Sequence, residues 1–495
     1  MKVLLSTLNT KYVHTNIAIK YLYESAKDKN IEVIEFTINE PINKILREIY
    51  DRDANVIAFS VYLWNIDEIL KLSENIKKIQ PKIKIVLGGP EVTYQSRLLL
   101  EKYTFIDYIL IGEGEESFPK LLDFMENENQ EKDILKNVSY RKDDGTIVEG
   151  EIAIVCDTNK IPKIASQIVE GYDGKIVYIE TVRGCPYNCS YCLSSTIKGI
   201  RPFDMQRVKD ELLILMKAKI RLVKFVDRTF NYDKQRALEI WKFILENNIS
   251  SEFHFEISAH LIDEEVLEFL ESVPAGVFRL EIGVQSTNPE TIKAINRTTN
   301  FEIIKSVVQR IMNKGNITTH LDLIAGLPFE GYERFKESFN DVYDLKPTEL
   351  QLGFLKLLSG CEITMKKDKY SYEYTSYPPY EILQNEFISF EELSKLKYVE
   401  EMVDVYHNSL RYKNSFGYVL NKYEKPFDMF YELSRFALEN NYFTRKISAE
   451  EWFDVLARFY IYKNFEDYNE FKEALKKDHF ENFGNKRRRG LIFFE

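Results

Sequence analysis

The chain has 495 residues, five cysteines and a formal net charge of −11 at pH 7. Five cysteines are too few for a disulfide framework and the N-terminus carries no export signal, so we expect a cytoplasmic protein with reduced thiols. No stretch reaches the roughly 18 apolar residues of a membrane helix. The acidic balance gives no electrostatic footprint for nucleic acid, and the one basic run covers residues 486–489.

Residues 1–140 alternate short apolar runs with helix-length amphipathic stretches. The predicted strands cover residues 2–6, 56–64, 84–89 and 107–115. Fully apolar strands separated by helices indicate a parallel sheet covered on both faces, which is a doubly wound, Rossmann-like α/β domain. Such domains bind ligands at the carboxyl ends of their strands, where Gly88, Gly89 and the "GEGE" run allow a close approach of backbone to ligand.

After a polar stretch at residues 141–174, which we interpret as a linker, a second alternating series covers residues 175–365. Its predicted strands are residues 175–184, 222–230, 253–260, 278–286, 319–328 and 350–358. Six βα units in sequence indicate a partial (β/α)6 barrel. Polar residues interrupt these strands near the carboxyl ends that carry function in barrels: Asp227, Glu256, Ser258, Glu281, Gln285 and Asp322.

Residues 366–495 are predicted to form a mainly helical domain rich in Tyr and Phe. Aromatic residues recur there at intervals of three and four positions, as in "MFYELSRFALENNYF". This spacing is more typical of a packed core than of a ligand site.

The segment "RGCPYNCSYCLSS" places Cys185, Cys189 and Cys192 within eight positions. A structural zinc site needs four ligands, usually as two pairs, and the remaining Cys156 and Cys361 stand alone. An iron–sulfur cluster held by only three thiolates leaves one iron open, and a small molecule can bind there. We therefore favour such a cluster.

The spacing Cys-x3-Cys-x2-Cys, with Tyr191 before the last cysteine and after the first strand of the series, resembles the radical S-adenosylmethionine superfamily. The runs "EIGVQS" and "LDLIAGLP" are similar to the fifth and sixth strands of the branch that carries an N-terminal cobalamin-binding domain. The runs "LLSTLNTKYVHTNIA", "GGPEVT" and "IGEGEESF" resemble that domain. The helical C-terminus is similar to that of one uncharacterised subgroup.

The resemblance implies three cofactors: a 4Fe-4S cluster, S-adenosylmethionine and cobalamin. It implies that Cys185, Cys189 and Cys192 hold the cluster and that Tyr191 contacts adenine. The resemblance also implies that S-adenosylmethionine is bound by Glu256, Ser258 and Gln285. It implies that the cobalamin loops include Gly88, Gly89 and Glu113. It assigns no catalytic residue.

The reaction that the resemblance implies is methylation of an unactivated carbon after a 5′-deoxyadenosyl radical removes a hydrogen atom. The alternatives are a cobalamin-dependent radical rearrangement and a non-catalytic cobalamin and iron–sulfur redox sensor. The expected partners are a flavodoxin- or ferredoxin-type electron donor and a small-molecule or peptide substrate.

Two departures from the family pattern stand out. "FVDRTF" replaces the usual Gly-Gly-Glu contact to S-adenosylmethionine, and the Asp-x-His-x-x-Gly motif for cobalt ligation is missing around His14.

Overall fold

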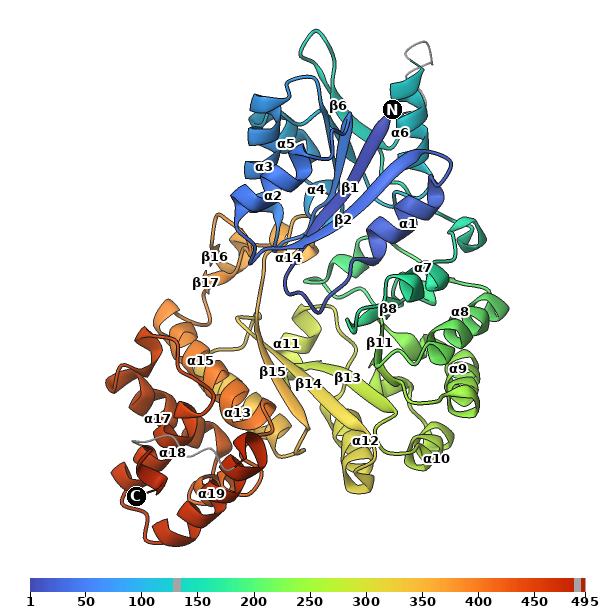
Figure 1. Cartoon of the computed structure of the whole chain (residues 1–495). Helices are drawn as coiled ribbons and strands as arrows, with labels where there is room; N and C mark the ends of the chain where they lie inside the picture. Colours follow the sequence, from blue (N-terminus) through green and yellow to red (C-terminus); the bar gives the residue numbers. More distant parts are fainter. Residues whose placement is uncertain (128–134, 485–490, 495) are drawn as a thin grey trace.

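The structure is a computed structural model that describes residues 1–127, 135–484 and 491–494. Figure 1 shows a first sheet domain at the top, a second sheet domain below it and a helical region at the lower left. The basic run at residues 486–489 lies outside the described residues. Within the described ranges, no helix is both long and apolar enough to cross a bilayer.

The first domain is built on a sheet with the strand order β2-β1-β3-β4-β5-β6-β7. Five neighbouring strands are parallel: β1 (Lys2–Asn9), β2 (Asn30–Thr37), β3 (Val56–Ser60), β4 (Lys84–Gly88) and β5 (Tyr108–Leu110). One face is covered by α1 (Ile17–Ser25) and α6 (Ser117–Glu126), and the other by α2 (Ile42–Tyr50), α3 (Ile66–Ile79) and α5 (Ser96–Lys102). The predicted doubly wound domain is confirmed.

Strand β2 was not predicted. It is an edge strand, and its only fully buried residue is Phe36. Polar residues therefore alternate through it, and it lacks the apolar run by which the other parallel strands are recognised.

The stretch predicted as a linker contributes ordered structure to both domains. Strands β6 (Val138–Arg141) and β7 (Ile147–Val148) form an antiparallel hairpin that extends the first sheet. Helix α7 (Ala165–Glu170) packs on α8 (Met205–Lys217) of the second domain. Ala153 still bridges to Gly112 of the first domain, and Arg207 of α8 donates to the Thr158 and Ile161 carbonyls, so the chain passes between the domains within residues 154–157.

The second sheet has six parallel strands in the order β15-β14-β13-β12-β11-β8, as an open partial barrel requires. The strands are β8 (Val177–Ile179), β11 (Leu222–Phe225), β12 (Glu252–Ile257), β13 (Phe278–Gln285), β14 (Thr318–Ala325) and β15 (Glu349–Phe354). Outer helices include α8, α9 (Lys234–Asn247), α10 (Glu264–Ser272), α12 (Phe301–Lys314) and α13 (Tyr332–Tyr343). In β13 and β14, buried apolar residues alternate with half-buried, mostly polar ones. Apolar side chains therefore face the helices, and polar ones face the concave side.

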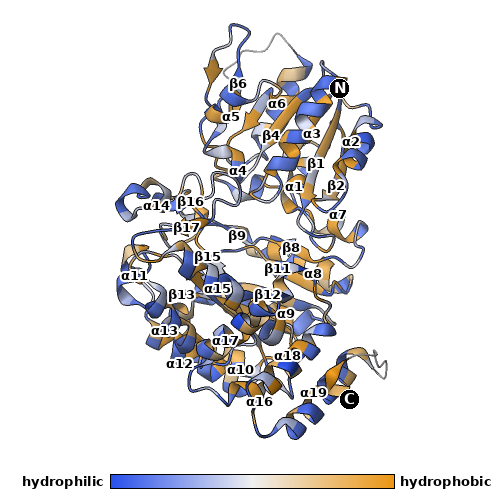
Figure 2. Cartoon of the chain, turned by 90° about the vertical axis from the view of Figure 1, so that its left-hand side faces the viewer, coloured by the Kyte–Doolittle hydropathy of each residue, from blue (hydrophilic) through white to orange (hydrophobic). Residues whose placement is uncertain are grey.

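The C-terminal region is mainly helical and shares one hydrophobic core with the second domain. Its principal helices are α15 (Phe390–Val403), α17 (Pro426–Glu439), α18 (Glu451–Tyr462) and α19 (Tyr468–Phe483). Helix α15 starts with a capping box between Ser389 and Glu392. Aromatic pairs such as Tyr460 and Phe471, stacked at 3.9 Å, fill its interior. Figure 2 shows orange, hydrophobic stretches alternating with blue, hydrophilic ones along the chain. The regular aromatic spacing thus forms a packed core.

Candidate functional site

The three clustered cysteines lie in one loop that follows the short strand β9 (Val182–Arg183) at the carboxyl edge of the second sheet. All three are free thiols, and Cys189 is buried. The Ser190 amide donates to the Ile295 carbonyl at 3.0 Å, which ties the loop to the barrel. Burial raises the pKa of Cys189, and the neighbouring Cys192 and Cys185 add to that shift. The loop therefore holds three thiols near one another, a donor set suited to iron.

Arg297 lies against this loop and was not predicted as a site residue. Its Nη1 donates to the Tyr191 hydroxyl at 3.1 Å and lies 3.7 Å from Cys189 Sγ, while its Nη2 donates to the Gly283 carbonyl at 2.6 Å. Tyr191, predicted to contact adenine, is thus held by a guanidinium beside the cysteines. Nothing in "AINRTTN" distinguishes this arginine from a surface residue, because its partners lie on other loops.

The segment that replaces Gly-Gly-Glu has two different roles. Asp227 is buried and accepts hydrogen bonds from the amides of Thr181 and Val182, at 2.7 and 3.2 Å, just before the cysteine loop. Burial raises its pKa to about 7. Arg228 lines a cavity and lies 3.4 Å from Glu256. Asp227 is therefore an anchor for the chain entering the loop, and the charge that this segment brings near the site is that of Arg228, which pairs with Glu256.

The other residues assigned to S-adenosylmethionine lie around the same loop. Ser258 Oγ is 2.9 Å from the hydroxyl of Tyr187, between the first two cysteines. Gln285 ends β13 at a bulge with φ of +70°, and its buried Oε1 has no hydrogen-bond partner within the described part of the chain. An unpaired acceptor in strained backbone is costly in a folded protein unless a ligand donor satisfies it. Burial raises the pKa of Glu256 against the opposing charge of Arg228.

A cavity of about 430 Å³ lies between the carboxyl edges of the two sheets. The first domain contributes the ends of β3, β4 and β5, including Ser60, Gly88 and Gly89, and the second contributes Gly184 and Leu193 from the cysteine loop. Concave sites at the strand ends of α/β sheets are where such domains bind ligands.

The two adjacent glycines at the end of β4 serve different purposes. Gly89 has φ of +120° and ψ of 175°, and a Cβ there would lie 2.4 Å from the Val61 carbonyl oxygen. A Cβ on Gly88 would make an ordinary contact with Leu110, at 3.5 Å. Gly89 is therefore required by the local backbone, whereas Gly88 leaves room beside the cavity.

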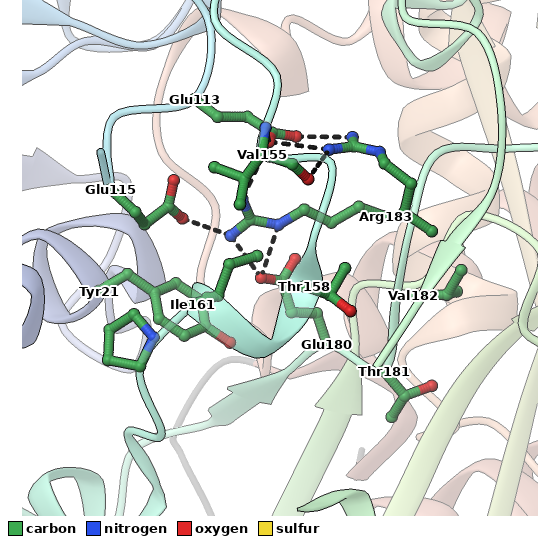
Figure 3. A network of polar contacts seen from close by, with 12 residues as sticks. Tyr21, Glu113, Glu115, Val155, Thr158, Ile161, Glu180, Thr181, Val182 and Arg183 are labelled. Carbon is green, nitrogen blue, oxygen red and sulfur yellow. Dashed lines mark hydrogen bonds and ion pairs between the residues drawn. The ribbon is translucent and has the colours of Figure 1, made fainter. Parts of the chain in front are cut away.

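Glu113, assigned to the cobalamin loops, lines the cavity but has partners in the second domain. Its carboxylate accepts from Arg201 Nη2 at 2.7 Å and Nη1 at 2.9 Å, and from the Val155 amide at 2.6 Å. Arg183 lies 3.4 Å from it and also pairs with Glu115 and Glu180, and Figure 3 shows these carboxylates around the arginine. We call these five side chains the interdomain charge cluster. Glu113 is thus an interdomain ion-pair partner.

Other polar contacts join the two domains around the cavity. They include His14 Nδ1 with the Tyr178 hydroxyl at 2.7 Å and the Tyr94 hydroxyl with Thr196 Oγ1 at 2.5 Å; the Tyr380 hydroxyl of the C-terminal region donates to Glu91 of the first domain at 2.8 Å. His14 therefore makes an interdomain hydrogen bond.

The residues present fit the three cofactors that the resemblance implies. The free thiols of one loop suit a cluster, the unpaired Gln285 oxygen suits an adjacent ligand with donor groups, and the cavity offers strand-end backbone to a large one. Cys361 is buried and donates to the Tyr191 carbonyl at 3.5 Å, and burial raises its pKa to about 12. Cys156 is exposed.

Three family models match consecutive parts of the chain. Residues 3–122 match the B12 binding domain, residues 179–342 match the radical SAM superfamily, and residues 368–493 match a protein of unknown function (DUF4080).

Curated relatives are distant. The cobalamin-dependent radical SAM methyltransferase TokK of Streptomyces tokunonensis is 25% identical over 59% of this chain and 45% of its own length. The anaerobic magnesium-protoporphyrin IX monomethyl ester cyclase of Cereibacter sphaeroides is 22% identical over 63% of this chain and 52% of its own. The chain spans about half the length of these relatives.

Among solved structures, the cobalamin-dependent S-adenosylmethionine radical enzyme OxsB, with aqua-cobalamin and S-adenosylmethionine bound, has a TM-score of 0.68. It is 16% identical, and the match covers 98% of this chain and 84% of OxsB, so it shows a common fold along nearly the whole chain. With these domains in this order around the cysteine loop, the chain belongs to the cobalamin-dependent radical SAM enzymes, whose cofactors are a 4Fe-4S cluster, S-adenosylmethionine and cobalamin.

Proposed function

We propose that this enzyme methylates an unactivated carbon of a small-molecule or peptide substrate. The observation that carries the proposal is the shared cavity, in which the strand-end loops of the cobalamin domain face residues of the cysteine loop. Among the relatives, the methyltransferase TokK supports methylation as the reaction class. When bound, the cluster with S-adenosylmethionine supplies hydrogen-atom abstraction, and cobalamin supplies a transferable methyl group.

In this proposal the chain's own residues bind and orient the cofactors and shield the site from water. Cys185, Cys189 and Cys192 are the thiolate ligands of the cluster. Arg297 fixes the Tyr191 side chain beside them through its bond to the hydroxyl. Gln285 offers its unpaired oxygen to a donor of S-adenosylmethionine.

Further residues act on the cobalamin side and between the domains. Gly88 keeps the end of β4 free of side-chain atoms where the cavity is formed. The contacts of the interdomain charge cluster hold the two strand edges together and limit the entry of water. A radical SAM enzyme requires a reductant, and we propose a flavodoxin- or ferredoxin-type donor.

A rearrangement is the second candidate, because the relatives include anaerobic magnesium-protoporphyrin ester cyclases as well as methyltransferases. In both reactions S-adenosylmethionine is cleaved. They differ in whether a methyl group is transferred to the product.

The test is anaerobic reconstitution of the full chain with iron, sulfide and hydroxocobalamin, followed by removal of unbound cofactor and addition of a strong reductant. We expect retained cobalamin and release of 5′-deoxyadenosine in the wild type and in Cys156→Ala, whose thiol is exposed and outside the loop. Cys189→Ala should retain cobalamin and release no 5′-deoxyadenosine.

Methyl-labelled S-adenosylmethionine then separates the two reactions once a substrate is supplied. Label in the product supports methylation, and an unlabelled rearranged product supports the second candidate. Retained cobalamin and an intact cluster without any cleavage of S-adenosylmethionine would refute both and leave the redox sensor.

A further inference from the structure

The concave side of the second sheet carries a network of charged and imidazole side chains to which no role has been given. Lys224, His254, Glu281 and His320 lie on four successive strands, β11 to β14. Lys224 is register partner of His254, and Glu281 of His320. Ion pairs with neighbouring side chains extend this lumen network to eight residues: Lys224, Glu252, His254, Arg279, Glu281, His320, Asp322 and Glu349.

Three of these side chains bring ligand atoms to one point. Each of three residues offers one possible ligand atom, and these atoms lie within 4.8 Å of one another: His254, Glu281 and His320. His254 Nε2 is 3.0 Å from a Glu281 carboxylate oxygen, yet this buried nitrogen makes no well-aligned hydrogen bond to any of the described residues. The ring nitrogen is therefore close to the carboxylate but not directed at it.

This geometry is expected of two ligands of one ion. A nitrogen and an oxygen that each lie about 2.1 Å from the same metal, at an angle of about 90°, are about 3.0 Å apart. The nitrogen lone pair then points to the metal and not to the oxygen. An ordinary histidine–carboxylate hydrogen bond has the same separation but a well-aligned N–H group.

The charge of the lumen network also favours a cation. Its eight residues include four carboxylates and two Lys or Arg side chains, so two negative charges are in excess when both imidazoles are neutral. The side chains of His254, Glu281 and His320 are only 11%, 19% and 18% exposed, so solvent compensates this charge poorly. A divalent ion would neutralise it.

We propose that His254, Glu281 and His320 bind a divalent transition-metal ion on the concave side of the barrel, separate from the cysteine cluster. Two imidazoles and one carboxylate suit iron(II), zinc or cobalt(II) better than magnesium or calcium. Three protein ligands leave coordination positions open to the lumen for water or a substrate oxygen. Lys224 lies 3.0 Å from the same Glu281 oxygen as His254 and competes with the ion for it.

The experiment uses the reconstituted full chain in its oxidised state, in which the 4Fe-4S cluster is diamagnetic. Cobalt(II) is the probe, bound ion is measured by anaerobic equilibrium dialysis, and its high-spin EPR signal is recorded. We expect one cobalt(II) per chain in addition to the cobalt of the bound cobalamin, and affinity reduced at least tenfold in His254→Gln and in Glu281→Gln. His260→Gln is the matched control, because His260 Nε2 accepts from the Asn300 amide outside the lumen network.

A second variant guards against a simple loss of folding. Lys224→Met removes the competing cation, so it should bind cobalt(II) more tightly than the wild type, and a misfolded chain would not gain affinity. If His254→Gln and the wild type bind cobalt alike, or if Lys224→Met shows no gain, the eight residues form an ion-pair network only and the proposal is wrong.

Discussion

Replacing Glu113 by alanine tests whether the interdomain charge cluster holds the two domains together. The Glu113 and Arg201 side chains are only 14% and 13% exposed, so their pair is buried. The substitution leaves Arg201 with the Val155 carbonyl as its remaining acceptor. Removing one partner of a buried pair costs about 3 to 5 kcal/mol, whereas an exposed pair contributes about 1 kcal/mol or less. At 1.4 kcal/mol per factor of ten, the lower figure is roughly a hundredfold.

Hydrogen exchange at the Ile176 amide measures this effect. That amide donates to the Val13 carbonyl at 2.8 Å across the domain boundary and does not touch Glu113. We expect its exchange to accelerate roughly a hundredfold in Glu113→Ala. Glu116→Ala is the matched control, because Glu116 and its partner Lys160 are 44% and 61% exposed. A change in Glu113→Ala no larger than in this control would refute the interpretation.

The same amide should respond to acid. Burial acts to raise the pKa of Glu113, but the bonds from Arg201, the charge of Arg183 and the Val155 amide together hold it below its usual value. A carboxyl whose pKa is lowered by folding stabilises the closed domains fully above the ordinary Glu pKa of about 4.3, and that contribution is lost as the pH falls below it. Protection of Ile176 should therefore decrease below about pH 4, and Glu113→Ala should remove this Glu113-dependent component.

Two further predictions concern the glycine pair and the cluster loop. Gly89→Ala should destabilise the protein by about 3 kcal/mol or more, because its backbone conformation is essentially confined to glycine and its Cβ would overlap Val61; a thermal midpoint equal to that of Gly88→Ala would contradict this. Arg297→Met should shift the reduction potential of the cluster to more negative values, by about 60 mV if the lost bond to Cys189 contributes about 1.4 kcal/mol to the reduced form. An EPR redox titration measures the shift, and an unchanged potential would show that Arg297 only positions Tyr191.

The sequence was informative where one local pattern determines the structure. The six apolar strands of the barrel and the four apolar strands of the first domain were found from their hydrophobic runs, and the cysteine loop from its spacing. Strand β2 was not predicted, because the sequence of an edge strand with one buried residue resembles that of a polar loop. The aromatic stripe of α17 was correctly assigned to a core.

The partners of site residues could not be predicted in the same way. Glu113 was found from its glycine-rich loop, but its partner Arg201 is 88 residues away and lies beyond the cysteines. Arg297 meets Tyr191 across 106 residues. The first contact depends on how the two folded sheets face one another, and the second on how two loops of the same sheet meet, so a single sequence carries no local signal for either.

The position of Arg183 limits how substrate can reach the cavity. It stands two residues before Cys185, and its guanidinium pairs with Glu115 of the first domain and Glu180 of the second. A hinge motion that parted the domains would therefore break buried ion pairs and pull on the polypeptide that carries Cys185. Substrate exchange by movement of surface loops, with the two sheets kept in place, would leave the cluster ligands undisturbed through each turnover.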